Sequence, residues 1–377
     1  MSFRETLSKF WNNVQLTLFT QLENDLGELS CDHKKLISIL ELVRIEDFIP
    51  NARFNGGRPR KERTAIARAY IAKIVFKHDY TKQLVKYLKV DKQLRAICGL
   101  DVFKKIPSES TFSRAFKEFS ASSLPEKVHE ALIKGVYKDQ TVGHVVIDST
   151  PLEVREKCLK KDDAKNRKKL KDRIRSRNKR LGEPNRRQKQ LKETNLKKMI
   201  QDLPKLCDKG MKKSSQGYTM VWKGYKLHAA VDDNCVPLAV VVTSASLNDC
   251  EAAIPVLSKC NQVVKNFYDL MDAAYDHPEI KEHSISLGHI PLIDKCPHNT
   301  SQKIEKEAEK KRKKLLNFKT AEDKRYKERL PKERFNATYK DYNGGRAVVY
   351  RGHSKVFCHV MFGILALTAA TIISIVQ

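Results

Sequence analysis

Four residues near the C-terminal end of the chain have types and a spacing that suit phosphate chemistry. Tyr326, Arg329, Glu333 and Lys340 follow the pattern Tyr-x2-Arg-x3-Glu-x6-Lys. At about 100° per residue, they fall within roughly 60° of one another on a helical wheel. One carboxylate among two cations and an aromatic ring suits a site that binds a metal ion and a polyanion together. The cations would hold phosphate, and the glutamate would complete the metal shell.

The same spacing also fits a solvated amphipathic helix with ordinary Glu–Lys and Glu–Arg pairs. Pro331 lies inside the pattern, and proline is tolerated in a helix mainly in its first turn. We therefore expect the helix to begin near Pro331, with Tyr326 and Arg329 on the turn before it. The argument from one helix face then holds strictly for Glu333 and Lys340 only.

Two further acids stand in apolar runs upstream. The run GHVVIDST, residues 143–150, predicts a short strand that ends in Asp148, and the run FYDLMDAAYD, residues 267–276, predicts a strand that ends in a second aspartate, Asp272. Continuous apolar runs of this length are typical of buried strands, and α/β sheets keep their sites at the carboxyl ends of strands. For each aspartate alone, a turn or helix cap is the alternative.

Three carboxylates from two strand ends and one helix can hold two divalent metal ions about 3.5–4 Å apart. Such a site activates water or a 3′-hydroxyl for in-line attack on a phosphodiester, and it stabilises the leaving oxygen. Ligands that are all oxygen favour Mg²⁺ or Mn²⁺ over zinc.

The elements between these acids predict a mixed sheet with helices packed on it. Residues 225–231 and 237–243 are expected to form a hairpin, with Asp232 and Asp233 as turn residues rather than ligands. Lys226 and His228 alternate onto one face of its first strand and are candidates to touch DNA or the site. A helix at 249–260, the strand before Asp272, a helix at 277–287 and a strand at 290–293 follow.

The N-terminal third of the chain predicts helices. Residues 1–50 are amphipathic and suit a supporting or dimerising role, and residues 51–61 form a Gly/Pro/Arg linker. The triplet at 57–59 fits either a minor-groove contact or simple entry into a helix. Three helical segments follow within 62–120, and the last carries Arg114 and Lys117 as candidate DNA contacts. The pattern fits a helix-turn-helix reader and equally a helical bundle with a basic surface.

The charge of the chain points to nucleic acid. The formal net charge is +28 and the pI about 9.7, which favours a polyanionic partner, with an anionic membrane surface as the second choice. Residues 155–213 alone hold 24 Lys and Arg against 8 Asp and Glu, a net of +16. This insert predicts a largely helical arm that neutralises phosphates, the alternative being a solvated arm.

Other features exclude some classes of protein. The nine cysteines are scattered without a CxxC pair, so neither a zinc ribbon nor a disulfide framework is indicated, and a reducing cytosol fits. The N-terminus carries acids and lacks an uninterrupted apolar core, unlike a signal peptide. Residues 359–377 are apolar and nearly long enough to span a membrane. We interpret them as a buried helix of a large α/β core.

At this point the chain resembles DDE-type insertion-sequence transposases with an RNase H-like catalytic core, in the bacterial group marked by a Tyr-Arg-Glu-Lys signature. The matching segments are HVVIDST, GYKLHAAVDDNCVPLAVVVTSASLND, FYDLMDAAYD, YKERLPKERFNATYKDYNGGRAVVYRG and KVFCHVMFGIL, and the helical stretch from about residue 55 resembles the N-terminal domain common in that group. The large basic insert and Pro331 depart from the pattern.

The resemblance implies roles for individual residues. Asp148, Asp272 and Glu333 would be the catalytic metal ligands for two Mg²⁺ or Mn²⁺ ions, and Tyr326, Arg329 and Lys340 would contact terminal DNA phosphates. The apolar C-terminal helix would pack on the sheet. Trp222 is a candidate to stack on a flipped base by residue type alone, the alternative being a core or hairpin-edge tryptophan.

The expected organisation is an N-terminal helical segment (1–50), a helical DNA-binding domain (51–125) and an α/β, RNase H-like catalytic domain (140–377) with a basic insert (155–215). The implied protein binds the terminal inverted repeats of its element as double-stranded DNA, pairs two ends as a homodimer in a synaptic complex, cuts the 3′ ends and joins them to target DNA. It would act in the bacterial cytoplasm at the nucleoid, without a membrane. A catalytically inactive DNA-binding relative and a non-enzymatic basic nucleic-acid-binding protein are the alternatives.

Overall fold

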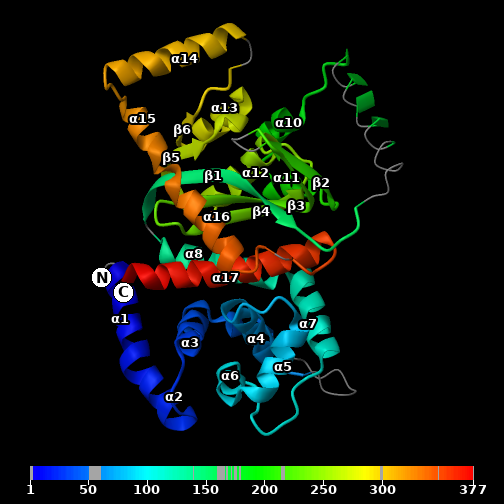
Figure 1. Cartoon of the computed structure of the whole chain (residues 1–377), viewed down its shortest axis with the longest axis vertical. Helices are drawn as coiled ribbons and strands as arrows, with labels where there is room; N and C mark the ends of the chain where they lie inside the picture. Colours follow the sequence, from blue (N-terminus) through cyan, green and yellow to red (C-terminus); the bar gives the residue numbers. More distant parts are fainter. Residues whose placement is uncertain are drawn as a thin grey trace. The chain divides into compact units, whose positions relative to one another are not determined.

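The computed structural model describes residues 3–50, 61–138, 140–158, 180–213, 217–297, 300–346 and 348–376, with 166, 169–170, 172–173 and 176–177. These residues form two compact units, which we describe separately (Figure 1). The helical unit comprises Met1–Lys138, Leu152–Glu156 and Asn336–Gln377, and the sheet unit comprises Asp139–Pro151 and Lys157–Phe335. These units are defined by contacts in space, so the domain boundaries expected from the sequence stay predictions.

The sheet unit is built on a mixed sheet. Its strands in the described part of the chain are β1 (Thr141–Glu153), β2 (Asp208–Lys213), β3 (Thr219–Asp232), β4 (Pro237–Ser244), β5 (Lys265–Met271) and β6 (Ile290–Ile293). Their order is β2-β3-β1-β5-β6, and β4 also pairs with β3. The pairs β1–β5 and β5–β6 are parallel, and β2–β3 and β3–β4 are antiparallel. This mixed sheet confirms the predicted α/β, RNase H-like fold class.

The hairpin between β3 and β4 forms where its apolar runs predict it. Every residue of β4 is buried, and the register runs from Tyr225 opposite Ser244 to Val231 opposite Pro237. At the turn, the Asp232 carboxylate accepts hydrogen bonds from the backbone N–H of Asn234 (2.9 Å) and of Val236 (2.7 Å). The prediction that Asp232 is a turn residue is confirmed, because its carboxylate satisfies backbone donors of that turn.

Helices accompany the sheet within the same unit. They are α10 (Arg186–Lys192), α11 (Leu196–Asp202), α12 (Cys250–Asn261), η3 (Ala273–Tyr275), α13 (Pro278–Ser286), α14 (Thr300–Leu315), α15 (Ala321–Arg325), η4 (Tyr326–Arg329) and the first turns of α16 (Leu330–Tyr342). Helix α12 is buried along most of its length and packs on β3, β4 and β5. It therefore forms one wall of the core beneath the sheet.

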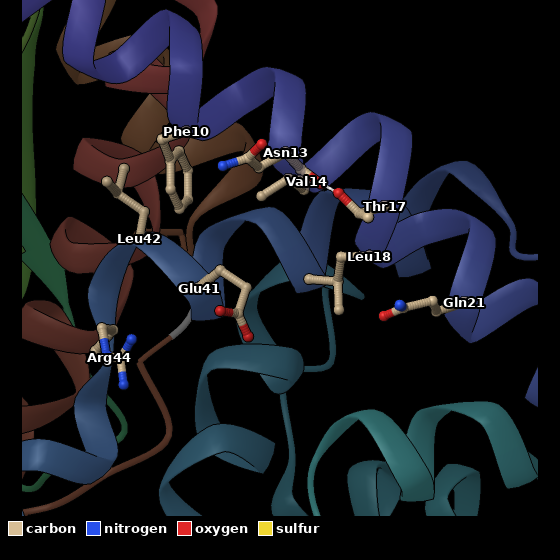
Figure 2. Close-up of a pocket in the computed structure, with 9 residues that line it drawn as sticks. All are labelled: Phe10, Asn13, Val14, Thr17, Leu18, Gln21, Glu41, Leu42 and Arg44. Atoms are coloured by element: carbon tan, nitrogen blue, oxygen red, sulfur yellow. Dashed lines mark hydrogen bonds between the residues drawn. The ribbon is translucent and has the colours of Figure 1, made fainter.

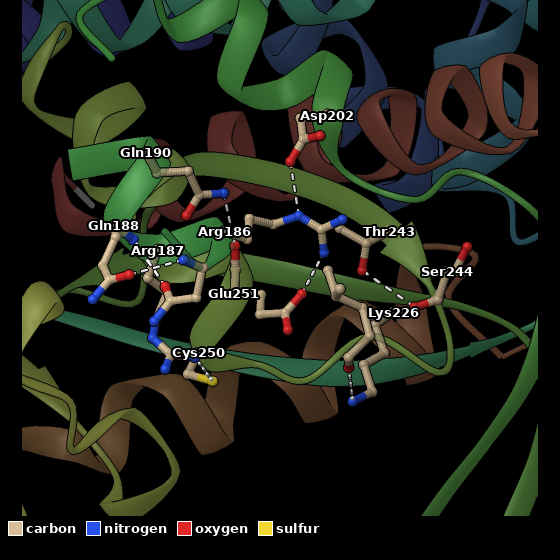
Figure 3. Close-up of polar contacts among 12 residues, drawn as sticks. Arg186, Arg187, Gln188, Gln190, Asp202, Lys226, Thr243, Ser244, Cys250 and Glu251 are labelled. Atoms are coloured by element: carbon tan, nitrogen blue, oxygen red, sulfur yellow. Dashed lines mark hydrogen bonds and ion pairs between the residues drawn. The ribbon is translucent and has the colours of Figure 1, made fainter. Parts of the chain in front are cut away.

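The second half of the basic insert is attached to this unit. Arg186 on α10 donates to Asp202 at 2.7 Å and pairs with Glu251 of α12 (Figure 3). Arg187 pairs with Glu279 of α13 at 3.5 Å, and Gln190 donates to the backbone oxygen of Glu251 at 3.1 Å. These ion pairs hold this part of the insert to the sheet unit, and the phosphate-neutralising role of the arm stays a prediction.

The helical unit begins with a nearly continuous N-terminal helix. Its elements are α1 (Phe3–Asn13), a π-helical turn η1 (Val14–Leu18), α2 (Phe19–Leu26), α3 (Cys31–Val43), η2 (Ile45–Phe48), α4 (Arg63–Val75), α5 (Thr81–Val90), α6 (Lys92–Ile97), α7 (Glu109–Ser122), α8 (Leu124–Val136) and α17 (His353–Val376). Residues 51–60, which carry most of the expected linker and the 57–59 triplet, lie outside the described residues.

These helices share one apolar core. Tyr70 on α4 lies at its centre, with the rings of Phe112, Phe116, Phe119 and Phe362 at centroid distances of 4.9–6.4 Å. The connection from α6 to α7 runs over residues 98–108, which is longer than the three or four residues of a helix-turn-helix. Of the two interpretations left open by the sequence, the structure therefore favours the helical bundle.

Helix α17 is a core helix of this bundle. In the described part of the chain it has the length and composition of a membrane span, yet 83% of its most apolar window is buried. It packs against α1, α3, α4, α7 and α8. The prediction of a buried helix is confirmed, whereas the expectation that it packs on the sheet of an α/β core is wrong, because its main contacts are with helices of the helical unit.

Candidate active site

The two predicted aspartates belong to neighbouring strands of the sheet, Asp148 within β1 and Asp272 directly after β5. Strands β1 and β5 are parallel, with Val145 opposite Asp269 and Val146 opposite Leu270. Asp272 directly follows β5, whereas β1 continues beyond Asp148 to Glu153, so the prediction that this strand ends at Asp148 is wrong. The printed pairing stops two residues before each aspartate, and the same register continued by two residues would set Asp148 opposite Asp272. Because side chains alternate with a period of two, Asp148 projects from the same face of β1 as Val146.

The two carboxylates have different surroundings. Asp148 is about one fifth exposed, and its Oδ1 atom accepts from the backbone N–H of Ser149 at 2.5 Å. Its Oδ2 atom forms an ion pair with the Nζ atom of Lys332. Asp272 caps the short helix η3, where Oδ1 accepts from the backbone N–H of Ala274 at 2.9 Å. Both carboxylate oxygens of Asp148 thus have partners, whereas Asp272 caps a short helix and is half-buried.

Glu333 lies in the first turn of α16. The helix begins at Leu330 with Pro331 in its first turn, as proline requires, and Glu328 in η4 departs from helical backbone angles. The expectation that the helix begins near Pro331, with Tyr326 and Arg329 on the turn before, is confirmed. The side chain of Glu333 is exposed, whereas the flanking Lys332 is buried.

Tyr326 and Arg329 form a contact of their own on η4. An Arg329 guanidinium N–H donates to the Tyr326 hydroxyl at 2.5 Å, and the guanidinium carbon lies 4.9 Å from the centre of the tyrosine ring. Burial is the largest influence on Tyr326 and raises its pKa, as do Asp294 and Asp272, while Arg329 lowers it. The sensitivity of Tyr326 to Asp272 places η4 in the electrostatic neighbourhood of that strand-end acid.

Tyr275 belongs to the same neighbourhood and was not predicted. It is buried on η3, and its hydroxyl has no hydrogen-bond partner in the described structure. Burial chiefly, with Asp249 and Asp272, raises its pKa well above the ordinary value, and Arg329 acts in the opposite direction. A tyrosine three residues after a strand-end aspartate is the only sequence feature that could have suggested it.

The three predicted acids do not make a closed ligand cage. Among the described residues, no group of three Asp, Glu, His or Cys side chains is close enough to hold one metal ion. The donor chemistry nevertheless fits Mg²⁺ or Mn²⁺, because all three are carboxylates and two of them come from neighbouring parallel strands. The ligand set therefore stays a prediction.

Comparison with known families decides the wider assignment. The sequence profile described as Transposase DDE domain matches residues 140–369, more than half of the chain. The chain belongs to the DDE transposase family. A second profile, described as Transposase domain (DUF772), matches residues 25–118 of the helical unit. No curated protein and no solved structure matches this transposase.

The remaining predicted DNA contacts of the transposase lie on helices. Lys340 is on α16, two turns beyond Glu333, and is partly exposed. Arg114 and Lys117 are exposed on α7, where the Arg114 Nε–H donates to the backbone oxygen of Ser110 at 3.3 Å. Their exposure is compatible with a DNA contact, and their role stays a prediction.

Two candidates from the hairpin are corrected. Lys226 donates to the backbone oxygen of Leu247 at 2.7 Å and pairs with Asp249 at 2.9 Å. His228 is buried and bonded to Thr243 at 2.9 Å, and burial followed by the nearby Lys226 lowers its pKa to about 4. The face that they share is turned to the protein, so neither is available to DNA.

Trp222 also belongs to the core of the sheet unit. It is 6% exposed, and its indole N–H donates to the backbone oxygen of Tyr225 at 3.1 Å. A Cβ atom at Gly210 would come 2.3 Å from its ring, so only glycine fits opposite it. Of the two alternatives for Trp222, the structure favours the core tryptophan.

A separate groove is found in the helical unit of the transposase. It lies between the N-terminal helix and the end of α3, at the π-helical turn (Figure 2). Its lining is Phe10, Asn13, Val14, Thr17, Leu18, Gln21, Glu41, Leu42 and Arg44. With a single carboxylate and a single guanidinium, this groove lacks the clustered acids that metal-dependent cleavage requires.

Proposed function

We propose that this transposase binds the terminal inverted repeats of its element and catalyses metal-dependent cleavage and joining of DNA strands. The observation that supports the proposal is the parallel pairing of β1 and β5, because Asp272 follows β5 at its carboxyl end and Asp148 lies on the neighbouring strand. The carboxyl ends of such strands are where an α/β sheet places its chemistry. Glu333, at the start of α16, is the third acid of the proposed set.

Asp148, Asp272 and Glu333 would hold Mg²⁺ or Mn²⁺, with two ions per site. Bound there, such ions would supply an activated water or 3′-hydroxyl and would neutralise charge on the leaving oxygen. The chain contributes orientation: Ser149 and Ala274 each donate a backbone N–H to one aspartate, which fixes its rotamer. Arg329, held by Tyr326, presents a guanidinium suited to a terminal phosphate.

The proposed function also includes double-stranded DNA as the partner and a homodimer as the assembly. Two element ends would be paired by a homodimer, with Lys340, Arg114 and Lys117 contributing further phosphate contacts, at the nucleoid of a bacterial cell. Phosphate contacts position the protein without reading sequence, so they support end binding by charge rather than by base recognition. The inverted repeats that flank the element are therefore the natural substrate for a test.

The test is cleavage of labelled DNA carrying the element ends, in Mg²⁺, in Mn²⁺ and with chelator. We expect wild type to nick the DNA only with metal. Glu333→Gln and Asp272→Asn should lower the rate more than about 100-fold, since even outer partners of metal ligands contribute 10- to 100-fold. DNA affinity should change little.

Glu328→Gln is the matched control, because Glu328 is an exposed glutamate on η4, five residues before Glu333. It should cleave as wild type does. Strong, salt-sensitive binding without cleavage in any metal would favour a catalytically inactive DNA-binding relative. Cleavage that survives Asp272→Asn would refute the assignment of the acids.

A further inference from the structure

A buried lysine contacts one of the candidate active-site acids, Asp148. Lys332 directly precedes Glu333 in the first turn of α16, and its side chain is 3% exposed. Its neighbours in sequence, Glu333 and Arg334, are both exposed. Helix geometry turns Lys332 about 100° away from Glu333, which directs it into the sheet unit.

The Lys332 ammonium is paired with Asp148. A buried ammonium is unfavourable unless an opposite charge compensates for its lost hydration. The Asp148 carboxylate supplies that charge through Oδ2, while its Oδ1 atom is held by the Ser149 N–H. Asp148 is thus neutralised by a residue of the chain itself, at the carboxylate expected to bind metal.

This pairing sets up a competition. An ammonium and a divalent cation that approach the same carboxylate repel each other, and the repulsion is strong in a site shielded from solvent. A metal ion at Asp148 must therefore displace the Lys332 side chain or bind beside a positive charge. Either arrangement weakens metal binding relative to a site with a neutral side chain at position 332.

We propose that Lys332 is the resident counter-ion of Asp148, a positioning residue that holds this carboxylate before metal binds and competes with metal for it. The inference rests on the proposed function, because it concerns the same acids. Beyond that function, the Lys332 ammonium would oppose the binding of metal by this transposase. Assembly with DNA, whose phosphates attract the ammonium, would then favour loading.

The experiment measures Mn²⁺ affinity of the full-length protein without DNA, by electron paramagnetic resonance titration. Lys332→Met keeps the length of the side chain and removes its charge. We expect it to bind Mn²⁺ about tenfold more tightly than wild type, because the repulsion is gone. Lys327→Met removes an exposed charge from the adjoining η4 and should bind as wild type does.

A double-mutant cycle in chelator tests the ion pair apart from metal. Asp148→Asn should lower the melting temperature by several degrees in wild type, because it removes the negative charge that compensates for burial of the ammonium. In Lys332→Met the same change should have little effect. Additive effects would mean that the pair does not exist and would overturn the proposal.

The outcomes distinguish the competition between Lys332 and metal from the proposed function itself. If wild type binds Mn²⁺ and Lys332→Met binds it equally or more weakly, the competition is refuted while the proposed function stands. If no variant binds Mn²⁺, wild type included, the metal assignment fails and the competition fails with it. Tighter binding by Lys332→Met alone, together with coupling in the cycle, is the result that supports Lys332 as the resident counter-ion.

Discussion

Two buried histidines make the stability of this protein depend on pH. His228 is fully buried in the sheet unit, and its pKa falls from an ordinary 6.5 to about 4 because of burial and then Lys226. His359 is buried in the helical unit, where burial and then Lys73 lower its pKa to about 3. Both side chains are therefore neutral in the folded protein at pH 7, and both must gain a proton in acid.

The sign of the effect follows from proton binding. Between about pH 6.5 and 4 the unfolded chain binds more protons at these two positions than the folded chain, so stability falls as pH falls. The loss from His228 is on the order of 3 kcal/mol across this window. We expect the melting temperature measured by calorimetry to drop steadily from pH 6.5 to 4.

His228→Gln is the informative variant, because a glutamine amide can replace the bond from His228 Nε2 to Thr243 and does not titrate. It should flatten the decline of the melting temperature with acid. His353→Gln, at the start of α17, is the control and should keep the slope of wild type. An unchanged slope in His228→Gln would mean that other groups carry the acid sensitivity.

Single residues also show where sequence reasoning succeeds and where it stops. Asp148 and Asp272 were predicted as strand-end acids because an apolar run marks a buried strand wherever it folds. The alternation of Lys226 and His228 predicted a strand correctly, but which face α12 covers is settled by tertiary packing. Lys332 gave no signal, because a lysine in a charged stretch is expected to be solvated and only the fold buries it.

At the scale of elements, local pattern was sufficient for the hairpin and for helix starts. Helix α5 spans Thr81–Val90 as expected, and Pro331 marks the start of α16. The insert was harder, because Arg186 and Arg187 are paired with acids more than 60 residues away along the chain. A run of charged residues in the sequence shows only its composition. Which of its cations form ion pairs depends on which distant acids the fold brings near them.

The insert also brings two cysteines together at its base. The Sγ atoms of Cys158 and Cys207 lie 3.9 Å apart, and neither is in a disulfide. Sulfurs in van der Waals contact need only a small rotation to reach bonding distance. We expect oxidised glutathione to convert the two thiols into a disulfide, with release of two reduced glutathione molecules, linking the start of the insert to β2.

Peptide mass spectrometry under non-reducing conditions checks this expectation. The cross-linked peptide should be the main product in wild type, and it should vanish in Cys158→Ser. Cys235→Ser, which changes another partly exposed cysteine, should leave it in place. Mixed glutathione adducts at both Cys158 and Cys207, without the cross-link, would contradict the expected closure.

At the scale of the whole molecule, the net charge of +28 does not by itself indicate which cations contact DNA. Cations that form ion pairs within the fold must first be distinguished from those that do not. Arg186 and Arg187 are neutralised by Asp202, Glu251 and Glu279. Helix α14 is the contrasting case, because none of its residues is buried. Its Lys310 and Lys311 are exposed and form no ion pair with the described residues.

This contrast predicts two different responses to salt. Each phosphate contact adds about 0.9 to the slope of log affinity against log salt for double-stranded DNA. If α14 meets DNA, replacing Lys310 and Lys311 with glutamine should reduce the slope by up to about 1.8. Replacing Arg186 and Arg187 with glutamine removes the same charge, yet it should leave the slope nearly unchanged and lower the melting temperature, because it breaks ion pairs of the fold.

Fluorescence anisotropy on labelled DNA from 50 to about 300 mM salt distinguishes the two variants, a range over which such slopes are readily measured. Equal loss of slope in both would mean that affinity follows total charge, as expected for a diffuse polyanion attraction. A loss confined to the α14 variant would mean that the position of a cation, rather than its number, decides DNA binding. The large positive charge would then have two separable functions, with ion pairs holding the insert to the sheet unit and unpaired lysines binding phosphate.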